Sequence, residues 1–559
     1  MKNITQSSSF KTILIRTNAG EYTGIGHLVR CLQLAKELKK HNIRVIFVLD
    51  SIEPNILEFL SCIEYKELYD SPQSELNQVV DAQKFITLCD KYQPVYAIVD
   101  DYRLSKEWEV LVSHHIDKLA VIDDILREHQ CDLIVDMKYR GSNTKQSYDT
   151  LVPTGTIKLL GPHYTLLAEQ YRQMPLEERV DIQKDQTDSF NIMISIGGGG
   201  DFSQCQKIIA SLLEHQSEFK KPIKIIPVLG PLSANSDAFI NRFKDHSNIT
   251  PLIGETDLYP FLKKTHLYIG AAGGTLYQLL SLQIPALTFA IADNQQSEKE
   301  QLEHIGHYFH LESLSTNEIK QIPYFCKTVA NNYSKFKKLI KQAKLHIDGY
   351  GVCRITEKLL TIAEPPIPDE TVINKLLSNN KNINLSENYQ LRPVTDQDIN
   401  HYLTSRNLPS NCQNMIQADK IPFLNHYTWW FNAQRESYLL SNNNSPCLYI
   451  WHEVKRYQQQ DFMIGGWFVC HEKMGFQEAL LALNWQLSYC QENFPNIPWI
   501  AVIHRENKFV KLLNKYLGFE DIGLDHAYSS AINALFNDAS FDDFYYVTFN
   551  ENNAKNKIT

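Results

Sequence analysis

The chain has 559 residues, of which 55 are Lys or Arg and 64 are Asp or Glu, so its formal net charge is −9. At about 150 residues per domain, this length predicts three or four globular units that each bury a core. An acidic chain without a block of Lys and Arg lacks the electrostatic attraction that drives binding to nucleic acid or anionic membranes. We therefore expect neither as a partner, and a small anionic ligand needs a local site.

The N-terminus and the cysteines indicate the compartment. Residues 1–10 are polar and lack the apolar segment of a signal peptide, and no apolar stretch approaches the ~20 residues of a membrane span. The 11 cysteines are scattered singly, without a CxxC pair. This pattern argues against a disulfide framework or a zinc finger, and it predicts a cytoplasmic protein with reduced cysteines.

The first part of the chain alternates short apolar runs with amphipathic stretches. Residues 13–15 and 45–49 are predicted strands with a helix at 28–39 between them, the pattern of a right-handed βαβ crossover. The carboxyl ends of parallel strands face the ligand crevice of an open sheet. Several later strands end on carboxylates, at Asp100, Asp101, Asp123, Asp124 and Asp136.

A second α/β series follows. Glycine-rich turns at residues 197–200 and 270–275 each come after a predicted strand and before a predicted helix. Two consecutive series predict two doubly wound α/β domains, at 1–175 and 176–360, with a cleft between them. This arrangement suits an enzyme of nucleotide sugars.

The composition changes between residues 361 and 388, where prolines and an Asn/Ser-rich run predict a linker. The remainder, 389–559, is predicted to be a separate α+β domain. Its expected strands lie at 389–393, 447–452, 461–469, 499–503 and 545–549, and its helices at 396–405 and 477–491.

The first candidate for chemistry is the sequence Gly-Ile-Gly-His that ends at His27, between a strand and a helix. Glycines there let the backbone approach a ligand, and a histidine with an ordinary pKa of about 6.5 can act as a general base. A helix-capping turn with a buried histidine is the alternative interpretation.

The two glycine-rich turns are the next candidates. Each can cradle a diphosphate through backbone N–H groups, but neither has the Lys of an ATP-binding P-loop nor the downstream acid of a dinucleotide site. The alternative is a tight turn without a ligand. Asp293, Asn294 and Gln295, after a further strand, can hydrogen-bond a sugar or ribose.

The strand-end carboxylates, with His114 and His115 between them, form a possible metal cluster. No spacing such as HExxH orders these ligands, and Asp is common in turns at strand ends. We therefore predict no metal site.

Nine motifs in order between residues 11 and 360 resemble one family, the UDP-2,4-diacetamido-2,4,6-trideoxy-β-L-altropyranose hydrolases of pseudaminic acid biosynthesis. They are RTNA at 16–19, GIGHLVR at 24–30, DDYRLSKEWE at 100–109, IDD at 122–124 with CDLIVD at 131–136, GPHYTLL at 161–167, ISIGGGGD at 194–201, IGAAGGT at 269–275, ADNQ at 292–295 and IDGYG at 347–351.

This resemblance implies a glycosyltransferase-B-like fold in which water attacks the anomeric carbon and UDP is released, without a cofactor. It implies His27 as the catalytic base. It also implies substrate-binding roles for Asn18, Gly24, Gly26, Arg30, Tyr102, Gly198, Gly199, Gly273, Gly274, Thr275, Gln278, Asp293, Asn294 and Gln295. Two positions depart from the family, which usually has Asp at Asn18 and Glu at Gln278. An amide can still hydrogen-bond a sugar or ribose, but without the strength of a charged acceptor.

The C-terminal domain resembles the Gcn5-related N-acetyltransferases, in particular the amino-sugar acetyltransferase of the same pathway. LRPVTDQDI at 391–399, HYTWWF at 426–431 and IGGWFV at 464–469 carry the resemblance. It implies acetyl-CoA as a cofactor, Tyr516 as the acid for the CoA thiolate, and Asn507 and Gly475 on the cofactor side. The pyrophosphate loop of that family is altered here, with one glycine and with acidic Glu472, so a domain that only binds sugar or packs is equally expected.

The sequence therefore predicts a UDP-sugar hydrolase with an appended acetyltransferase-like domain. If both domains are active, the chain carries two consecutive steps, acetylation and removal of UDP. A UDP-sugar glycosyltransferase and a non-catalytic nucleotide-sugar sensor are the alternatives.

Overall fold

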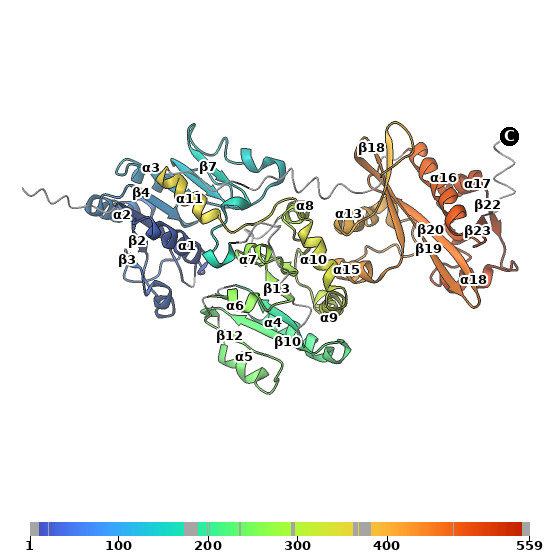
Figure 1. Cartoon of the computed structure of the whole chain (residues 1–559), viewed down its shortest axis with the longest axis horizontal. Coiled ribbons are helices and arrows are strands. Elements are labelled where there is room, and N and C mark those ends of the chain that lie inside the picture. The colour runs from blue at the N-terminus through green and yellow to red at the C-terminus, as the bar shows by residue number, and fades with distance from the viewer. Residues whose placement is uncertain are drawn as a thin grey trace, which may run out of the picture. The chain divides into compact units, whose positions relative to one another are not determined.

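The computed structural model describes residues 11–549, except for residues 21, 173–187, 198, 201, 234–235, 256, 292–296, 362–366, 368–381 and 473–474. The chain divides into two compact units, residues 1–374 and 375–559. The first unit contains two parallel sheets with their helices, which we call the N-half (residues 11–172) and the C-half (residues 188–347) (Figure 1).

The N-half is built on a seven-stranded parallel sheet with the order β3-β2-β1-β4-β5-β6-β7. The chain builds outward from β1 in one direction and then returns to place β4 on its other side. The carboxyl ends of β1 and β4 therefore flank the point where the strand order reverses, which is where open α/β sheets bind ligands. The strands are β1 (Thr12–Thr17), β2 (Arg44–Leu49), β3 (Glu64–Glu67), β4 (Tyr96–Asp100), β5 (Leu119–Ile122), β6 (Leu133–Asp136) and β7 (Ile157–Leu160), and the helices are α1 (Gly26–Lys40), α2 (Gln78–Tyr92) and α3 (Lys106–Ser113).

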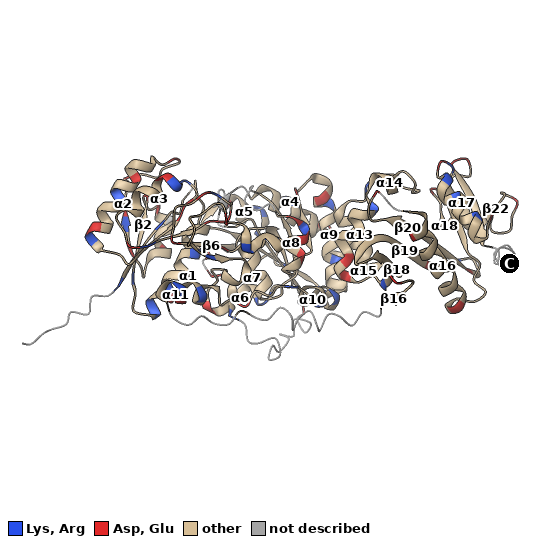
Figure 2. Ribbon diagram, turned by 90° about the horizontal axis from the view of Figure 1, so that it is seen from above, with Lys and Arg blue, Asp and Glu red and all other residues tan. Residues whose placement is uncertain are grey.

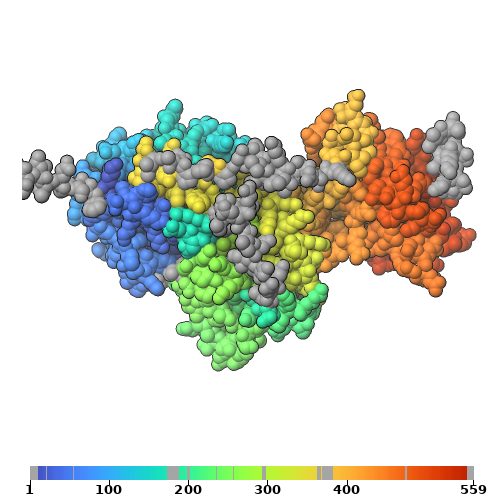
Figure 3. Space-filling view, viewed as in Figure 1, coloured from blue at the N-terminus to red at the C-terminus, as the bar shows by residue number. Residues whose placement is uncertain are grey.

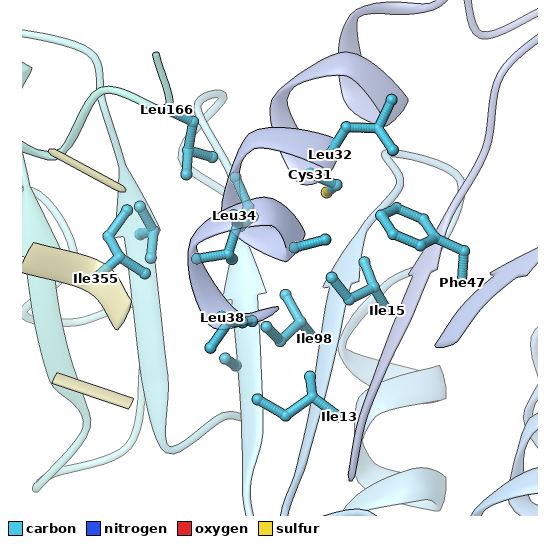
Figure 4. Packing of buried hydrophobic residues seen from close by; sticks show 14 of the residues in the cluster. Ile13, Ile15, Cys31, Leu32, Leu34, Leu38, Phe47, Ile98, Leu166 and Ile355 are labelled. Carbon is cyan, nitrogen blue, oxygen red and sulfur yellow. The ribbon is translucent and has the colours of Figure 1, made fainter. Parts of the chain in front are cut away.

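Both faces of this sheet are buried. Ile13 and Ile15 of β1 pack on one face with α1, whereas Leu14 between them packs on the other face with α2 and α3. Figure 4 shows Leu34 and Leu38 of α1 directed toward the strands. Burial on both faces explains why β1 appears in the sequence as a continuous apolar run.

The C-half repeats the plan with six parallel strands in the order β12-β10-β8-β13-β14-β15. Here the order reverses between β8 and β13, and the two glycine-rich turns of the sequence follow these two strands. The strands of the C-half are β8 (Phe190–Ser195), β10 (Ile223–Leu229), β12 (Leu252–Ile253), β13 (Leu267–Ala271), β14 (Ala286–Phe289) and β15 (Phe309–Leu311), with the small pair β9 (Gly199–Gly200) and β11 (Leu232–Ser233). The helices are α4 (Ser203–Glu214), α5 (Ser236–Phe243), α6 (Tyr259–Leu262), α7 (Thr275–Ser281), α8 (Lys299–His304), α9 (Thr316–Asn331) and α10 (Tyr333–Lys341).

The last helix of the first unit, α11 (Gly351–Leu360), returns to the N-half. Val352, Ile355 and Leu359 belong to the same apolar core as α1, and the yellow residues of α11 lie against the blue N-terminal segment (Figures 1 and 3). Gly351, at the end of the IDGYG motif, lets the start of α11 approach Thr165 closely, because a Cβ at this position would lie 2.3 Å from the Thr165 carbonyl oxygen. The two parallel sheets and this return helix form a glycosyltransferase-B-like α/β architecture.

The second unit is antiparallel. Five strands have the order β16-β17-β18-β19-β20, and three more have the order β21-β23-β22. Between the two sheets, an isolated parallel bridge joins Met463 of β20 to Trp499, the residue before β21. The strands are β16 (Ile383–Asn384), β17 (Tyr389–Pro393), β18 (Glu436–Asn442), β19 (Ser445–Tyr457), β20 (Gln460–Val469), β21 (Ile500–His504), β22 (Phe519–Ile522) and β23 (Phe544–Phe549), and the helices are α13 (Ile399–Arg406), α14 (Pro409–Cys412), α15 (Phe423–Asn432), α16 (Phe476–Asn493), α17 (Lys508–Leu517) and α18 (Ser529–Leu535).

Several elements of the second unit differ from the sequence prediction. Strand β16 lies inside the segment that we predicted to be a linker, and strands β18 and β22 and helices α14, α15, α17 and α18 were not predicted. Strand β18 pairs with both β17 and β19, so it is a central strand whose neighbours supply its hydrogen bonds.

The charged residues are mixed along the helices of each unit (Figure 2). Of the helices in the described part of the chain, none combines the length and the apolarity that crossing a bilayer requires.

Candidate functional site

The turn between β1 and α1 places His27. Gly24 has a φ of +68°, a left-handed conformation that favours glycine, and its N–H donates to the Gly20 carbonyl at 2.8 Å. Helix α1 begins at Gly26, so His27 lies in its first turn. The motif therefore brings an imidazole to the carboxyl edge of the sheet, beside the reversal of strand order.

The partner of His27 is Asp100, the last residue of β4. His27 Nδ1 lies 2.6 Å from Asp100 Oδ1, and the Asp100 side chain is fully buried. Arg30, one turn further along α1, donates from Nε to Asp100 Oδ2 at 2.7 Å and from Nη2 to Oδ1 at 2.5 Å. Burial alone would raise the pKa of Asp100, but the charges of Arg30 and His27 hold it well below its usual range. Asp100 is therefore a carboxylate.

A second carboxylate, Asp124, lies at the same edge. Arg30 donates from Nη1 to Asp124 Oδ2 at 2.9 Å, and the Tyr102 hydroxyl donates to Asp124 Oδ1. The Tyr102 ring meets the His27 ring edge to face, with 4.5 Å between centroids. Arg30 thus joins the carboxylate that holds His27 to the carboxylate that holds Tyr102.

These side chains open into a cleft of about 1630 Å³ that is lined by both halves of the first unit. Pockets for drug-sized ligands have about 300–1,000 Å³, so this cleft has room for a nucleotide sugar and water. The N-half contributes His27, Arg30, Tyr102 and Asp124 to its wall. The C-half contributes the turns after β8, β10 and β13.

The wall from the C-half consists mainly of backbone. Gly270 allows β13 to approach β8, because a Cβ there would lie 1.8 Å from the Ser195 carbonyl oxygen. Gly273, Gly274 and Thr275 then line the cleft at the start of α7. Backbone N–H groups in such a turn can hold an anion.

Two buried side-chain oxygens of this wall lack a hydrogen-bond partner among the described residues, Ser233 Oγ and Gln278 Oε1. The Oε1 atom of Gln278 is buried at the cleft and forms no hydrogen bond with any described residue. A buried acceptor without a partner is costly, so a ligand hydroxyl is the kind of group that would satisfy it.

Two of the predicted substrate-binding residues have protein partners in the structure. Asn18 is 6% exposed and is not among the described residues that line the cleft; its side-chain oxygen accepts from the Asp50 N–H at 3.3 Å. Arg30 lines the cleft, and its guanidinium forms ion pairs with Asp100 and Asp124. Sequence order alone cannot reveal these partners, because Asp50, Asp100 and Asp124 come from other strands.

The remaining predicted residues divide into two groups. Gly24, Gly26, His27 and Tyr102 line the cleft from the N-half, and Gly273, Gly274, Thr275 and Gln278 line it from the C-half. Gly199 lies in β9, which pairs with β11. Gly198, Asp293, Asn294 and Gln295 lie outside the described residues.

The sequence interpretation missed the importance of Asp100 and Asp124. Both were visible as strand-end acids, but turn chemistry accounted for them equally well. The other acids of this edge are held by arginines, Asp101 by Arg103 at 2.5 Å and Asp123 by Arg127 at 2.9 Å. In the described part of the chain, no group of three or more His, Cys, Asp or Glu side chains is arranged to hold a metal ion.

In the second unit, the three residues with implied acetyltransferase roles lie at the starts of two helices and on the surface of one of them. Asn507 caps α17, because its side-chain oxygen accepts from the Val510 N–H at 3.1 Å. Tyr516 is 57% exposed on the same helix. Gly475 is the N-cap of α16, and a Cβ there would lie 2.6 Å from the Glu478 carboxylate. A carboxylate therefore occupies the helix start where the resemblance implies a pyrophosphate.

Comparison with known proteins gives distant relatives. No protein-family model matches the chain. An uncharacterized protein of Methanocaldococcus jannaschii is 22% identical over 486 residues, covering 85% of this chain and 90% of that protein. The UDP-2,4-diacetamido-2,4,6-trideoxy-β-L-altropyranose hydrolase of Campylobacter jejuni is 25% identical over 287 residues, covering 51% of this chain and 93% of that protein.

Among solved structures, the UDP-GlcNAc 2-epimerase of Neisseria meningitidis bound to UDP-GlcNAc aligns with 63% of this chain and 100% of its own, with a TM-score of 0.42 and 15% identity. The M. jannaschii alignment is longer than the 374 residues of the first unit, so it reaches into the second unit.

Proposed function

We propose that the first unit hydrolyses UDP-2,4-diacetamido-2,4,6-trideoxy-β-L-altropyranose to UDP and the free sugar. The observation that carries this proposal is the His27–Asp100 pair at the cleft. Because a carboxylate can only accept, the 2.6 Å contact places a proton on His27 Nδ1. In neutral His27, Nε2 then has a lone pair that can accept a proton from water, as a general base must.

The proposed reaction balances with one water. The water oxygen bonds to the anomeric carbon as the bond from that carbon to the UDP oxygen breaks, and UDP leaves with the bonding pair. The water proton moves to His27 Nε2 and then to solvent. Backbone N–H groups of residues 273–275 are suited to hold the charge that develops on the diphosphate.

Three findings support this assignment. The hydrolase of C. jejuni is similar over half of the chain. The cleft has room for a nucleotide sugar, and Gln278 presents an unpartnered oxygen to it.

A glycosyltransferase would use the same cleft and would show slow hydrolysis that accelerates with an acceptor. A sensor would bind UDP without turnover.

UDP release from this substrate tests the proposal, with UDP-GlcNAc as the control substrate. We expect His27→Ala to lower kcat at least ~100-fold, the usual contribution of a general base. His115→Ala is the matched control, since His115 is an exposed histidine of the same half. In ¹⁸O water, attack at the anomeric carbon places the label in the sugar. Label in UDP, or no release by the wild type, would refute the proposed reaction.

For the second unit, we propose that acetyl-CoA is not a ligand of the native chain. The Glu478 carboxylate lies at the start of α16, where it repels a pyrophosphate. We derive no acetyl transfer step from these residues.

Calorimetric titration of acetyl-CoA into the full chain tests this second proposal. We expect no saturable binding by the wild type, and binding that strengthens by ~5-fold or more, about 1 kcal/mol, in Glu478→Gln. Glu492→Gln, on an exposed part of α16, is the matched control. Saturable binding by the wild type would restore the acetyltransferase interpretation and leave the hydrolase proposal unaffected.

A further inference from the structure

The contacts of Asp100 account for both of its oxygens. Oδ1 receives His27 Nδ1 and Arg30 Nη2, while Oδ2 receives Arg30 Nε and, at 3.2 Å, the Cys31 thiol. The Asp100 side chain has no exposed surface. Asp100 therefore cannot contact a substrate, and it is held in one orientation by three residues of α1.

We propose that Asp100 and Arg30 are positioning residues for His27. Asp100 fixes the tautomer and the ring orientation of the base, and Arg30 fixes Asp100 and ties it to Asp124 and Tyr102. This role rests on the proposed function, since it concerns the same reaction. It assigns to Arg30 a structural task in place of the substrate-binding role that the resemblance implied.

The tautomer is the central point. Neutral imidazole has one N–H and one lone pair, so the nitrogen that donates to Asp100 decides which nitrogen can accept a proton. With Nδ1 donating, Nε2 is the base. An amide at position 100 can present its NH₂ group to Nδ1, and the proton would then reside on Nε2, where it blocks the reaction.

Asp100 also faces the charge that the reaction creates. When Nε2 takes the water proton, His27 becomes an imidazolium cation whose Nδ1–H points at the buried carboxylate. Because Asp100 is shielded from water, this attraction is stronger than it would be at the surface. The carboxylate keeps its negative charge throughout, and the proton leaves from Nε2.

Arg30 also links Asp100 to a second carboxylate of the same cleft wall, Asp124. Its guanidinium contacts Asp100 with two nitrogens and Asp124 with the third, and Asp124 in turn receives the hydroxyl of Tyr102. A planar guanidinium can bridge two carboxylates in this way, whereas the single ammonium of lysine cannot reproduce the geometry. The positions of His27 and Tyr102 therefore depend on one side chain.

Two measurements on the full chain test this role. The first, ¹⁵N NMR of histidine-labelled protein, reports the His27 tautomer without any substrate, with His27→Gln used to assign the signal. We expect the Nδ1–H tautomer in the wild type and its loss in Asp100→Asn. The matched control is Asp101→Asn, which removes the neighbouring buried carboxylate that pairs with Arg103. An unchanged tautomer in Asp100→Asn would overturn the proposal, whether or not the chain is a hydrolase.

The second measurement is the steady-state kinetics of UDP release. We expect kcat of Asp100→Asn to fall at least ~100-fold with KM changed less than about threefold, because buried Asp100 does not contact the substrate and its loss acts on the proton transfer to His27. Arg30→Lys, which keeps a positive charge beside Asp100, should retain the Nδ1–H tautomer but lose at least about tenfold in kcat. Equal losses in Asp100→Asn and Asp101→Asn would reduce Asp100 to a folding role and refute the inference. Absence of release by the wild type would refute the proposed function instead, and the tautomer result would then stand alone.

Discussion

The two halves of the first unit bury their titratable groups in opposite ways. The N-half buries charges in pairs: Arg16 contacts Asp50 at 2.6 Å and Asp81 at 2.8 Å with no exposed surface on any of the three side chains. The C-half buries neutral groups instead. Thr288 Oγ1 lies 2.6 Å from His307 Nε2 and 2.8 Å from His310 Nδ1, without a carboxylate in direct contact.

This difference matches the tasks that we propose for the two walls of the cleft. A wall that holds a base needs fixed side chains, and ion pairs between neighbouring strand ends supply fixed geometry. A wall that holds an anion needs free backbone N–H groups and close approach of the chain, which glycines supply. The stability of the N-half should therefore depend mainly on its buried ion pairs, and that of the C-half on the close approach of its strands at glycine.

Removal of a buried charge in the N-half should have the largest effect on stability. In Arg16→Ala, Asp50 and Asp81 lose their shared guanidinium, and we expect unfolding to become easier by about 3–5 kcal/mol. Urea denaturation measures this change. Arg44→Ala is the control, because Arg44 pairs with Glu64 at the surface, and its cost should stay below ~1 kcal/mol. Equal costs would contradict the view that burial gives these pairs their importance.

The buried histidines should give the two halves opposite responses to pH. Burial alone would lower the pKa of His129, but Asp123 and Glu109 raise it to about 9. Its contribution to the free energy of unfolding, about 3 kcal/mol, is complete below pH 6.5 and is lost as the pH rises through about 9. Burial lowers the pKa of His307 to about 3, so its contribution is present above pH 6.5 and is lost as the pH falls.

Urea denaturation between pH 5 and pH 9.5 measures both limbs of this curve. His129→Gln should flatten the alkaline limb, and His307→Gln should flatten the acid limb. A His129→Gln variant that keeps the full alkaline loss would show that His129 is not the group responsible.

A steric change should be most damaging in the C-half. A methyl group at Gly270 would lie 1.8 Å from the Ser195 carbonyl oxygen, so β13 and β8 must separate in Gly270→Ala. We expect a loss of about 1–3 kcal/mol, as for other overpacked sites. Gly274→Ala is the matched control in the same turn, since nothing lies within 4 Å of its added methyl group. Thermal unfolding compares the two variants, and equal shifts would refute the close-approach argument.

The smallest effect concerns Gln278. In Gln278→Ala, the proposed hydrogen bond to a ligand hydroxyl is lost, and KM for UDP release should rise about fivefold, or ~1 kcal/mol, with kcat unchanged. Gln278→Glu should lower KM, because a charged acceptor binds a hydroxyl more strongly. If both variants keep the wild-type KM, Gln278 does not contact the substrate.

Much of the local structure could be predicted from the sequence. Residues 389–393 and 461–469 were predicted as strands and correspond to β17 and β20. The helix predicted at 477–491 corresponds to α16. Strand β18 was missed because its place in the sheet depends on pairing with β17, which is distant in the sequence, as well as with β19.

The sequence by itself determined that strand-end acids and glycine turns meet at the edges of two parallel sheets, since βα rhythm and turn chemistry are local properties. Only the tertiary structure decided which acid meets which base. Asp100 lies 73 residues from His27 and 70 from Arg30 along the chain, yet it holds both. The reason is that the return of the chain places β4 next to β1. Hydrogen bonds at that edge then bury Asp100 behind His27, and His27 faces the cleft.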